Sequence, residues 1–192
     1  AFPGTITLRA DTLQQLCLDI GESLIYHGFK RLVFINGNRV ANLPPMETAA
    51  SKLRFRSGAF AAVADAGLIA KAAVHAVCDS PEGGLGHAGE SETAYTLYRN
   101  PDFVDMSLAA DLERHQGRFG LSHKPLEPPF DGDSVYVPRT DTDMRRSTQA
   151  TQGIAGSASL ATREKGERIH EILSDALVDF IETHVKTAQV DL

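Results

Sequence analysis

A short apolar run that ends in a turn constrains the fold of this chain more than any other feature. Residues 32–35 (LVFI) carry no charge, and the turn-forming sequence Asn36-Gly37-Asn38 follows directly. A short uninterrupted apolar run is typical of a strand buried on both faces, as in parallel sheets. In open α/β sheets, ligands bind at the carboxyl ends of the strands. We therefore predict a strand over residues 31–35 and a candidate site directly after it.

A helical pattern precedes this strand. Apolar side chains recur at three- and four-residue spacing over residues 11–26, which predicts a helix that Asp11 or Thr12 caps and Gly28 ends. The predicted apolar face of this helix consists of Leu13, Leu16, Cys17, Ile20 and Leu24.

Further elements are predicted after the strand. Pro44-Pro45 fits the first turn of a helix, which we predict from Met46 to Asp65. The Ala- and Val-rich residues 68–78 are predicted as a second buried strand.

The second half of the chain alternates loops with helical patterns. We predict a short helix that ends near Tyr98, where Asn100-Pro101 stops it, and a last helix over residues 162–184. The proline-rich residues 123–152 are predicted to be a long loop that is functional, disordered or packed on a neighbouring subunit. The alternation of helices and strands predicts an α/β fold with a mostly parallel sheet flanked by helices, in a single domain over residues 1–192.

Composition excludes several classes of function. The chain has 192 residues and a net charge of −6, which disfavours binding to phosphate backbones or anionic membranes. No window of 18 apolar residues occurs, so no transmembrane helix is predicted. Cys17 and Cys78 lie far apart without a metal-binding spacing. We therefore expect free thiols in a reducing, cytoplasmic compartment.

The strongest candidate for chemistry is the segment 86–92 (GHAGESE). It holds His87 and the carboxylates Glu90 and Glu92, between glycines that let the backbone approach a ligand. An imidazole can act as metal ligand or general base near pH 7, and a carboxylate is a hard ligand for divalent cations. The alternative is a solvated loop before a helix, whose dipole favours Glu90 and Glu92 in the first turn.

A second candidate lies on the turn after the predicted strand. Asn36, Gly37 and Asn38 could orient a substrate, and Arg39 could pair with carboxylate or hydroxyl oxygens. The alternative is a plain tight turn made of turn-forming residues. The sequence has no Gly-x-Ser-x-Gly elbow and no P-loop lysine, and residues 141–143 lack the glycine and distal Glu of a calcium loop.

Four segments resemble, in family order, motifs of the creatininase family of creatinine amidohydrolase-like metalloenzymes. The first is FPGTITL at residues 2–8, followed by HGFKRLVFINGN at residues 27–38. The next two are GHAGESETA at residues 86–94 and NPDFVD at residues 100–105. The last is GIAGSASLATREKGE at residues 153–167. Each motif is weak alone, but together they span nearly the whole chain.

This resemblance implies a three-layer α/β sandwich. It also implies a hydrolase in which one or two divalent cations, zinc or manganese, activate a water that attacks a carbonyl carbon. By position, His87 would be the catalytic histidine and Glu92 a metal ligand. Asn38 falls where the family has a metal-binding histidine. The predicted substrate-binding residues are Asn36, Gly37, Arg39 and Glu90.

Two departures from the family pattern affect this prediction. The amide of Asn38 is a weaker zinc ligand than imidazole, so one metal position is lost, weakened or shifted toward harder ions. The family's N-terminal unit, with further metal ligands, precedes the segment at which this sequence begins. Three explanations remain open: a processed precursor whose N-terminal piece stays bound, a separate subunit, or a relative without catalysis. We favour a bound partner chain, because a missing strand would leave a sheet edge unpaired.

We therefore predict a metal-dependent hydrolase that acts on a cyclic amide or another small polar carbonyl compound. Creatinine itself is disfavoured, since the family's creatinine enzymes use tryptophans around the substrate and this sequence has none. The rival prediction is a catalytically degenerate subunit with a scaffold or ligand-binding role. The resemblance also implies an oligomer, since members of the family commonly form hexamers.

Overall fold

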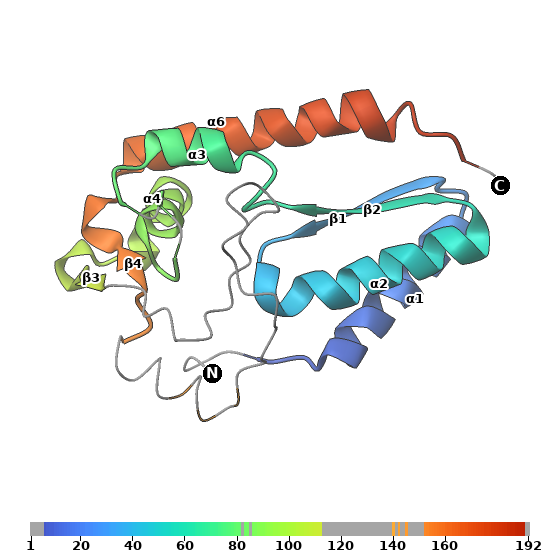
Figure 1. Ribbon diagram of the computed structural model, residues 1–192, viewed down its shortest axis with the longest axis horizontal. Coiled ribbons are helices and arrows are strands. Elements are labelled where there is room, and N and C mark those ends of the chain that lie inside the picture. Colours follow the sequence, from blue (N-terminus) through green and yellow to red (C-terminus); the bar gives the residue numbers. More distant parts are fainter. Residues whose placement is uncertain are drawn as a thin grey trace, which may run out of the picture. The chain divides into compact units, whose positions relative to one another are not determined.

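The chain folds into two compact units (Figure 1). The computed structural model describes residues 6–81, 83–84, 86–112, 140, 142, 145 and 152–190. We call residues 6–77 and 168–192 the sheet unit, and residues 1–5 and 78–167 the α4 unit. The prediction of a single domain over residues 1–192 stays a prediction.

The sheet unit contains two parallel strands, β1 (Arg31–Asn36) and β2 (Phe60–Asp65). Their register pairs Arg31 with Phe60 at one end and Asn36 with Asp65 at the other. The strand expected near residues 31–35 and the parallel sheet are therefore confirmed. Burial on both faces does not extend to Ile35, which is 58% exposed.

The second strand lies elsewhere than predicted. The prediction of a strand over residues 68–78 is wrong, because residues 66–70 form turns and Lys71–Val77 forms helix α3. The N–H of Gly67 donates to Asp65 Oδ1, which turns the chain at the end of β2. The alanines of α3 favour a helix. Because alanine is also apolar, the segment has the same run of apolar residues as a buried strand.

Helix α1 (Ala10–Tyr26) confirms the first predicted helix, and Gly28, with φ of +93°, follows its end. Its N-cap is Arg9, so the predicted caps are wrong in position. The buried face also differs from the predicted one, since Cys17, Leu18 and Gly21 are buried. Gly21 lies against Leu53 of the next helix, and this close approach turns the small side of α1 inward. On the predicted face, Leu16 and Ile20 are exposed.

Helix α2 (Arg39–Ser57) differs from the predicted helix at both ends. Pro44 and Pro45 lie inside it, where they lack the N–H donors of a regular helix, and the helix begins at Arg39. It ends because Gly58 takes a left-handed conformation, with φ of +72°, and its N–H donates to the carbonyl of Arg54. The residues after this glycine form β2, so the predicted continuation to Asp65 is wrong.

The α4 unit takes its name from helix α4 (Glu90–Arg99), which confirms the predicted short helix and its end at Asn100. Two 3₁₀ turns follow, η1 (Pro101–Phe103) and η2 (Met106–Leu108). Strands β3 (Asp111–Leu112) and β4 (Gly156–Ser157) pair antiparallel, and the 3₁₀ turn η3 (Ala158–Leu160) comes next.

The last predicted helix is confirmed as α6 (Arg163–Phe180), which continues as a π-helical segment, η4 (Ile181–Val185). Residues up to 167 of this helix belong to the α4 unit, and the later ones belong to the sheet unit. Near the start of α6, a side chain at Gly166 would overlap the carbonyl oxygen of Ala94 in α4. These helices therefore approach each other closely at a glycine.

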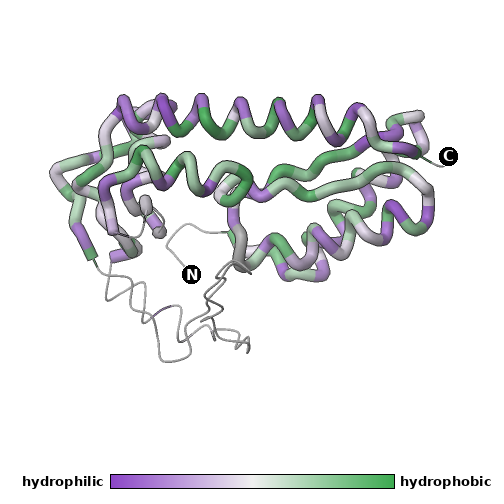
Figure 2. Tube along the Cα trace, turned by 45° about the horizontal axis from the view of Figure 1, so that its top comes forward, coloured by the Kyte–Doolittle hydropathy of each residue, from purple (hydrophilic) through white to green (hydrophobic). Residues whose placement is uncertain are grey.

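The core of the sheet unit lies between the strands and the helices α1 and α2. Figure 1 shows both helices on one face of β1 and β2, with the C-terminal part of α6 on the other side. Figure 2 shows the strands as the most continuously hydrophobic segments of the described trace, whereas α6 alternates. Among the described residues, Leu53 is the largest apolar side chain that is fully buried. The predicted α/β class is confirmed, and its three-layer arrangement stays a prediction.

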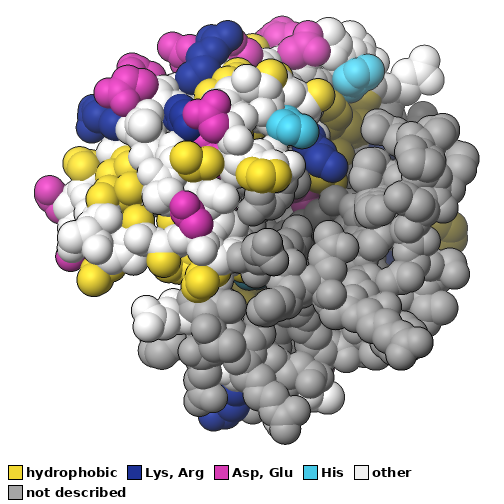
Figure 3. All heavy atoms as spheres, turned by 60° about the vertical axis from the view of Figure 1, so that its left-hand side comes forward, with side chains coloured by type: hydrophobic (Ala, Val, Ile, Leu, Met, Phe, Trp, Pro, Cys, Tyr) yellow, Lys and Arg dark blue, Asp and Glu magenta, His cyan; other side chains and the backbone are white. Residues whose placement is uncertain are grey.

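Among the described residues, no helix is long and apolar enough to cross a membrane. Cys17 and Cys78 are free thiols. On the side of the molecule that carries α4, acidic and basic side chains lie close together (Figure 3). The predicted loop over residues 123–152 lies outside the described residues except at positions 140, 142, 145 and 152. The cytoplasmic location stays a prediction.

Candidate functional site

A glycine-rich loop precedes α4 and carries the main candidate. Gly84, with φ of +82°, lies against Cys78, and a Cβ atom there would overlap the Cys78 sulfur. Gly86, with φ of +149°, lies against the carbonyl of Ala155, which leaves no room for a side chain. These glycines let the loop pack its backbone against Cys78, just before the loop, and against the distant segment at Ala155.

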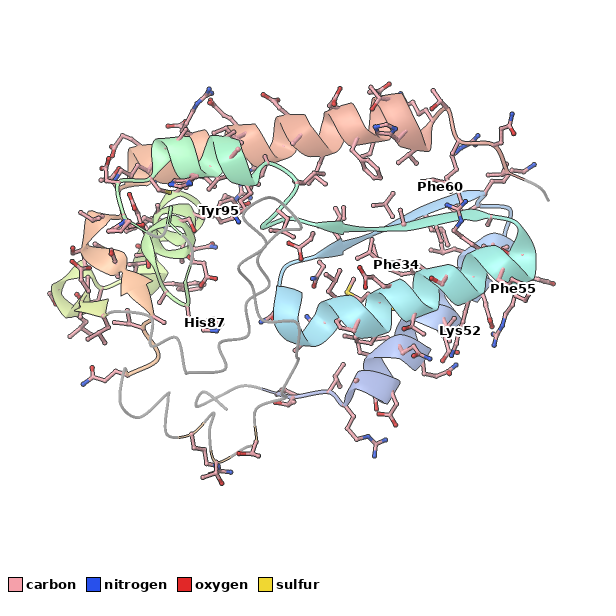
Figure 4. The ribbon with its side chains drawn as sticks, in the orientation of Figure 1. Phe34, Lys52, Phe55, Phe60, His87 and Tyr95 are labelled. Carbon is pink, nitrogen blue, oxygen red and sulfur yellow. The ribbon has the colours of Figure 1, made fainter. Side chains whose placement is uncertain are left out.

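His87 follows this close approach and is exposed. Its carbonyl accepts a hydrogen bond of 2.8 Å from the N–H of Ala155, which fixes its backbone. The next residue, Ala88, has φ of +47°, a left-handed conformation that is uncommon outside glycine. Figure 4 shows His87 on the loop below α4. An exposed imidazole on a fixed backbone can transfer protons to or from a bound molecule.

Glu92 lies in the first turn of α4 and is exposed. Its Oε2 accepts a hydrogen bond of 2.9 Å from the N–H of Ala88. Its Oε1 has no partner among the described residues, so it could coordinate a cation. The bond to Ala88 also satisfies a donor near the helix N-terminus, as a cap does. Glu92 therefore has a structural role that is independent of any metal.

Glu90, the first residue of α4, is fully buried, with 0% of its surface exposed. Its carboxylate accepts hydrogen bonds from the N–H groups of Asp79 and Ser80, at 2.9 and 2.8 Å, and from the ammonium of Lys165. Burial by itself would raise the pKa of Glu90, but Lys165 and the two N–H groups hold it below its ordinary value. Glu90 is an ionised structural anchor, and its predicted contact with a substrate stays a prediction.

Lys165 was missed by the sequence analysis as a site-related residue, although its motif was part of the resemblance. Its ammonium donates to Asp79 Oδ2 at 2.7 Å, to the carbonyl of Leu160 at 2.8 Å, and to Glu90. Three acceptors match the three donors of an ammonium group. Burial would lower the pKa of Lys165, but the carboxylates of Asp79 and Glu90 outweigh it and raise the pKa.

Two serines hold the glycine-rich loop in place. Ser80 Oγ accepts from the N–H of Gly84 at 2.7 Å, and Ser91 Oγ donates to the carbonyl of Gly84 at 2.6 Å. A serine in a loop gives no signal in the sequence that it will hold a neighbouring glycine, so this role could not be predicted.

The second candidate lies in the sheet unit, at the carboxyl ends of β1 and β2. Asn36 is 1% exposed; its Nδ2 donates to Asp65 Oδ2 at 3.2 Å, and its Oδ1 accepts from the N–H of Asn38 at 3.1 Å. Gly37 and Asn38 are exposed. Asn38 is the N-cap position of α2 without a side-chain cap, and Arg39 begins the helix. The buried amide of Asn36 therefore fixes the turn that presents Asn38.

Asp65 is the residue of this second candidate that the sequence analysis missed. Its Oδ1 accepts from the N–H of Gly67 at 3.0 Å, while Oδ2 accepts from Asn36. The signal was an Asp after an apolar run, at a strand end, but that run was assigned to a helix. A hollow of about 250 Å³ lies beside Asp65, lined also by Val63, Ala64, Leu68, Ile69 and Phe180.

The two sets of candidate residues belong to different units. His87, Glu90 and Glu92 lie in the α4 unit, whereas the residues 36–39 lie in the sheet unit. Within the described parts of the chain, no three His, Cys, Asp or Glu side chains are grouped so that they could hold a metal ion. Glu92 offers one carboxylate oxygen, which fits a single position of a divalent cation. The described residues by themselves therefore form no complete metal site.

Comparison with known proteins gives a consistent result. The family model described as Creatininase, creatinine amidohydrolase, matches residues 1–181. A creatinine amidohydrolase of Pseudomonas putida is 31% identical over an alignment of 195 residues. The alignment covers 94% of this chain and 65% of that relative. The chain thus spans less than two thirds of the length of this curated relative.

Solved structures of creatininases resemble the fold. A manganese creatininase is 30% identical with a TM-score of 0.64, and the match covers 96% of this chain and 68% of that one. A variant creatininase of Zn-Zn type is also 30% identical, with a TM-score of 0.63 and coverage of 96% and 67%.

Proposed function

This chain belongs to the creatininase family, and we propose that it carries part of the active site of a metal-dependent hydrolase that cleaves C–N bonds in small polar carbonyl compounds. The observation that carries the proposal is the position of His87 directly before Ala88, whose N–H is bonded to Glu92. An exposed imidazole and an exposed carboxylate flank Ala88, whose N–H is bonded to Glu92 Oε2. This arrangement keeps a proton-transfer group and a cation ligand on one fixed stretch of backbone.

A divalent cation bound at such a site would polarise the substrate carbonyl and activate a water. Glu92 would hold the cation through Oε1 while Oε2 keeps its bond to Ala88. His87 would transfer a proton to the leaving nitrogen, which makes C–N cleavage easier because an amine leaves better than an amide anion. Glu90 keeps the loop in place and remains ionised.

We propose zinc or manganese as the cation, because creatininases of manganese and Zn-Zn types are among the similar structures. Further ligands would come from a bound N-terminal fragment or a second subunit. Asn38 would contribute an amide oxygen at most, which favours a hard ion over zinc at that position. The bound partner chain and the hexamer remain predictions.

The substrate class follows from the polar residues of the second candidate. The exposed Gly37 and Asn38, on the turn that the buried Asn36 fixes, would orient polar groups of a cyclic amide or a formamide, and the contact of Arg39 with a substrate stays a prediction. Creatinine remains disfavoured, because the sequence contains no tryptophan. A catalytically degenerate subunit is the second candidate function, and the observation that favours it is Asn38 at the position where the family has a metal-binding histidine.

Metal content and hydrolysis distinguish these functions. We expect one or two divalent ions per purified molecule and hydrolysis of at least one small cyclic amide or formamide, with creatinine included in the panel. His87→Ala should lower the rate by about 10²-fold or more. His75→Ala is the matched control, because His75 is also exposed but lies on α3 in the sheet unit. A metal-free protein that His87→Ala and Glu92→Gln leave unchanged would be the degenerate subunit.

A further inference from the structure

We propose that Lys165 and Glu90 form a positioning pair that holds the His87 loop, in addition to stabilising the fold. This inference rests on the proposed function in one respect only, that His87 is the group whose position matters. This role does not require the predicted contact of Glu90 with a substrate. Both residues act through the backbone of the loop.

The pair connects three segments of the α4 unit. Glu90 is the first residue of α4, Asp79 and Ser80 begin the glycine-rich loop, and Lys165 lies in the first turn of α6. The Glu90 carboxylate bonds the N–H groups at the start of the loop, and Lys165 bonds both carboxylates and the carbonyl of Leu160. Lys165 and Glu90 therefore connect the start of the loop, its end and the C-terminal segment.

Hydrogen bonds hold the described residues of the loop between these anchors. Ser80, which Glu90 holds, accepts from Gly84, and Gly84 is bonded in turn to Ser91 in α4. At the other side, the N–H of Ala155 donates to the carbonyl of His87. Ala155 belongs to the same C-terminal segment that leads through η3 to Lys165. The bonds that hold Gly84 and the bond that holds His87 therefore all involve segments that Lys165 and Glu90 join.

Because the pair is buried, its loss should change the structure of the neighbouring backbone. Glu90 is 0% exposed and the Lys165 side chain is 17% exposed. Removing one partner of a buried pair leaves the other charge without compensation, so the neighbouring backbone must open to let water in. The backbone that opens first is residues 79–80 and the loop after them, because these N–H groups have the Glu90 carboxylate as their acceptor.

The test compares Lys165→Met, Lys165→Arg and Glu90→Gln with Lys186→Met. Lys186 is the matched control, because it pairs with Glu182 on the same C-terminal stretch but in an exposed position. In the metal-free protein we measure hydrogen exchange of the Ala88 and Ala155 amides and the NMR signals of the His87 ring, identified with His87→Gln. We expect Lys165→Met to speed exchange at both amides by about tenfold or more and to move the ring signals. Lys165→Arg should restore both in part, and Lys186→Met should change neither.

Each outcome decides the proposal. Unchanged ring signals and amide exchange in a folded Lys165→Met protein would overturn it. If that variant does not fold, Glu90→Gln takes its place with the same criteria, and if both variants unfold, the pair is a global stability element and the proposal is wrong. The failure of the proposed function is separate, since it would appear as hydrolysis that His87→Ala leaves unchanged, while the NMR readout requires no turnover.

Discussion

The backbone N–H of Ala88 donates to Glu92 Oε2 at 2.9 Å. Ala88 is the residue after His87, so a carboxylate in the first turn of α4 fixes the backbone next to the imidazole. The bond satisfies a donor that the helix itself cannot satisfy. Glu92 has a capping role and a proposed role as a cation ligand, and a substitution can separate them. The amide oxygen of a glutamine can still accept the hydrogen bond from Ala88, but it carries no charge to bind a cation.

We predict that Glu92→Ala and Glu92→Gln differ in stability. Glu92→Ala removes the acceptor of the Ala88 N–H and should lower the free energy of unfolding by about 1 kcal/mol. Glu92→Gln keeps an acceptor oxygen, so the loss should stay within about 0.5 kcal/mol. Urea unfolding of the metal-free protein measures both. Equal losses in the two variants would show that the bond to Ala88 contributes nothing.

The sequence predicted the residues of the candidate site better than their partners. His87, Glu90 and Glu92 were found because imidazole and carboxylates near glycines are recognisable as chemistry. Lys165 was not, because its role depends on a contact with Glu90, 75 positions earlier in the chain. Such a contact is a property of the packed structure and leaves no local signal.

The errors in the fold have a similar origin. The periodicity of α2 continues by chance into Phe60 and Val63, so the sequence analysis joined β2 to the helix before it. Gly58 was the correct signal for the end of the helix, and apolar spacing outweighed it. In α1, the buried face was misplaced because Gly21, with no hydrophobic side chain, is the residue that allows Leu53 to approach.

Two glycines at helix contacts should respond differently to the same substitution. At Gly166, a Cβ atom would overlap the backbone carbonyl of Ala94, whereas at Gly21 it would overlap the flexible side chain of Leu53. A backbone carbonyl in a helix cannot move without moving α4. We therefore expect Gly166→Ala to cost about 3 kcal/mol of unfolding free energy and Gly21→Ala about 1 kcal/mol. Thermal or urea unfolding of both variants measures the difference, and the reverse order would contradict the contact at Ala94.

Cys78 should react slowly with alkylating reagents. Burial, and after it the negative charge of Glu90, raise the pKa of the Cys78 thiol from 9.0 to about 11. Since the thiolate is the reactive form, the alkylation rate at pH 8 should be about a hundredfold below that of an exposed thiol with the ordinary pKa. Iodoacetamide labelling of a Cys17→Ala protein between pH 7 and pH 9.5, with a cysteine peptide as control, measures this. We expect about a tenfold rise in rate per pH unit over that range, and a plateau beginning near pH 9 would contradict the prediction.

The stabilising effect of Glu90 should disappear in acid. Folding lowers its pKa below the ordinary 4.5, so its ionised form is favoured in the folded state. This contribution is fully present above the unfolded pKa and is lost as the pH falls through the folded pKa.

At pH 7, we expect Glu90→Gln to cost about 3 kcal/mol of unfolding free energy, because Lys165 loses its buried partner. The difference from the unsubstituted protein should shrink as the pH falls below 4.5. It should stay constant between about pH 6 and pH 8, because the ordinary pKa of Cys78 is 9.0 and that of Lys165 is 10.5, and folding raises both. Urea unfolding across this pH range measures the difference, with Glu182→Gln as control, since Glu182 forms an exposed pair with Lys186. A difference that does not change in acid would mean that Glu90 is not ionised in the folded protein.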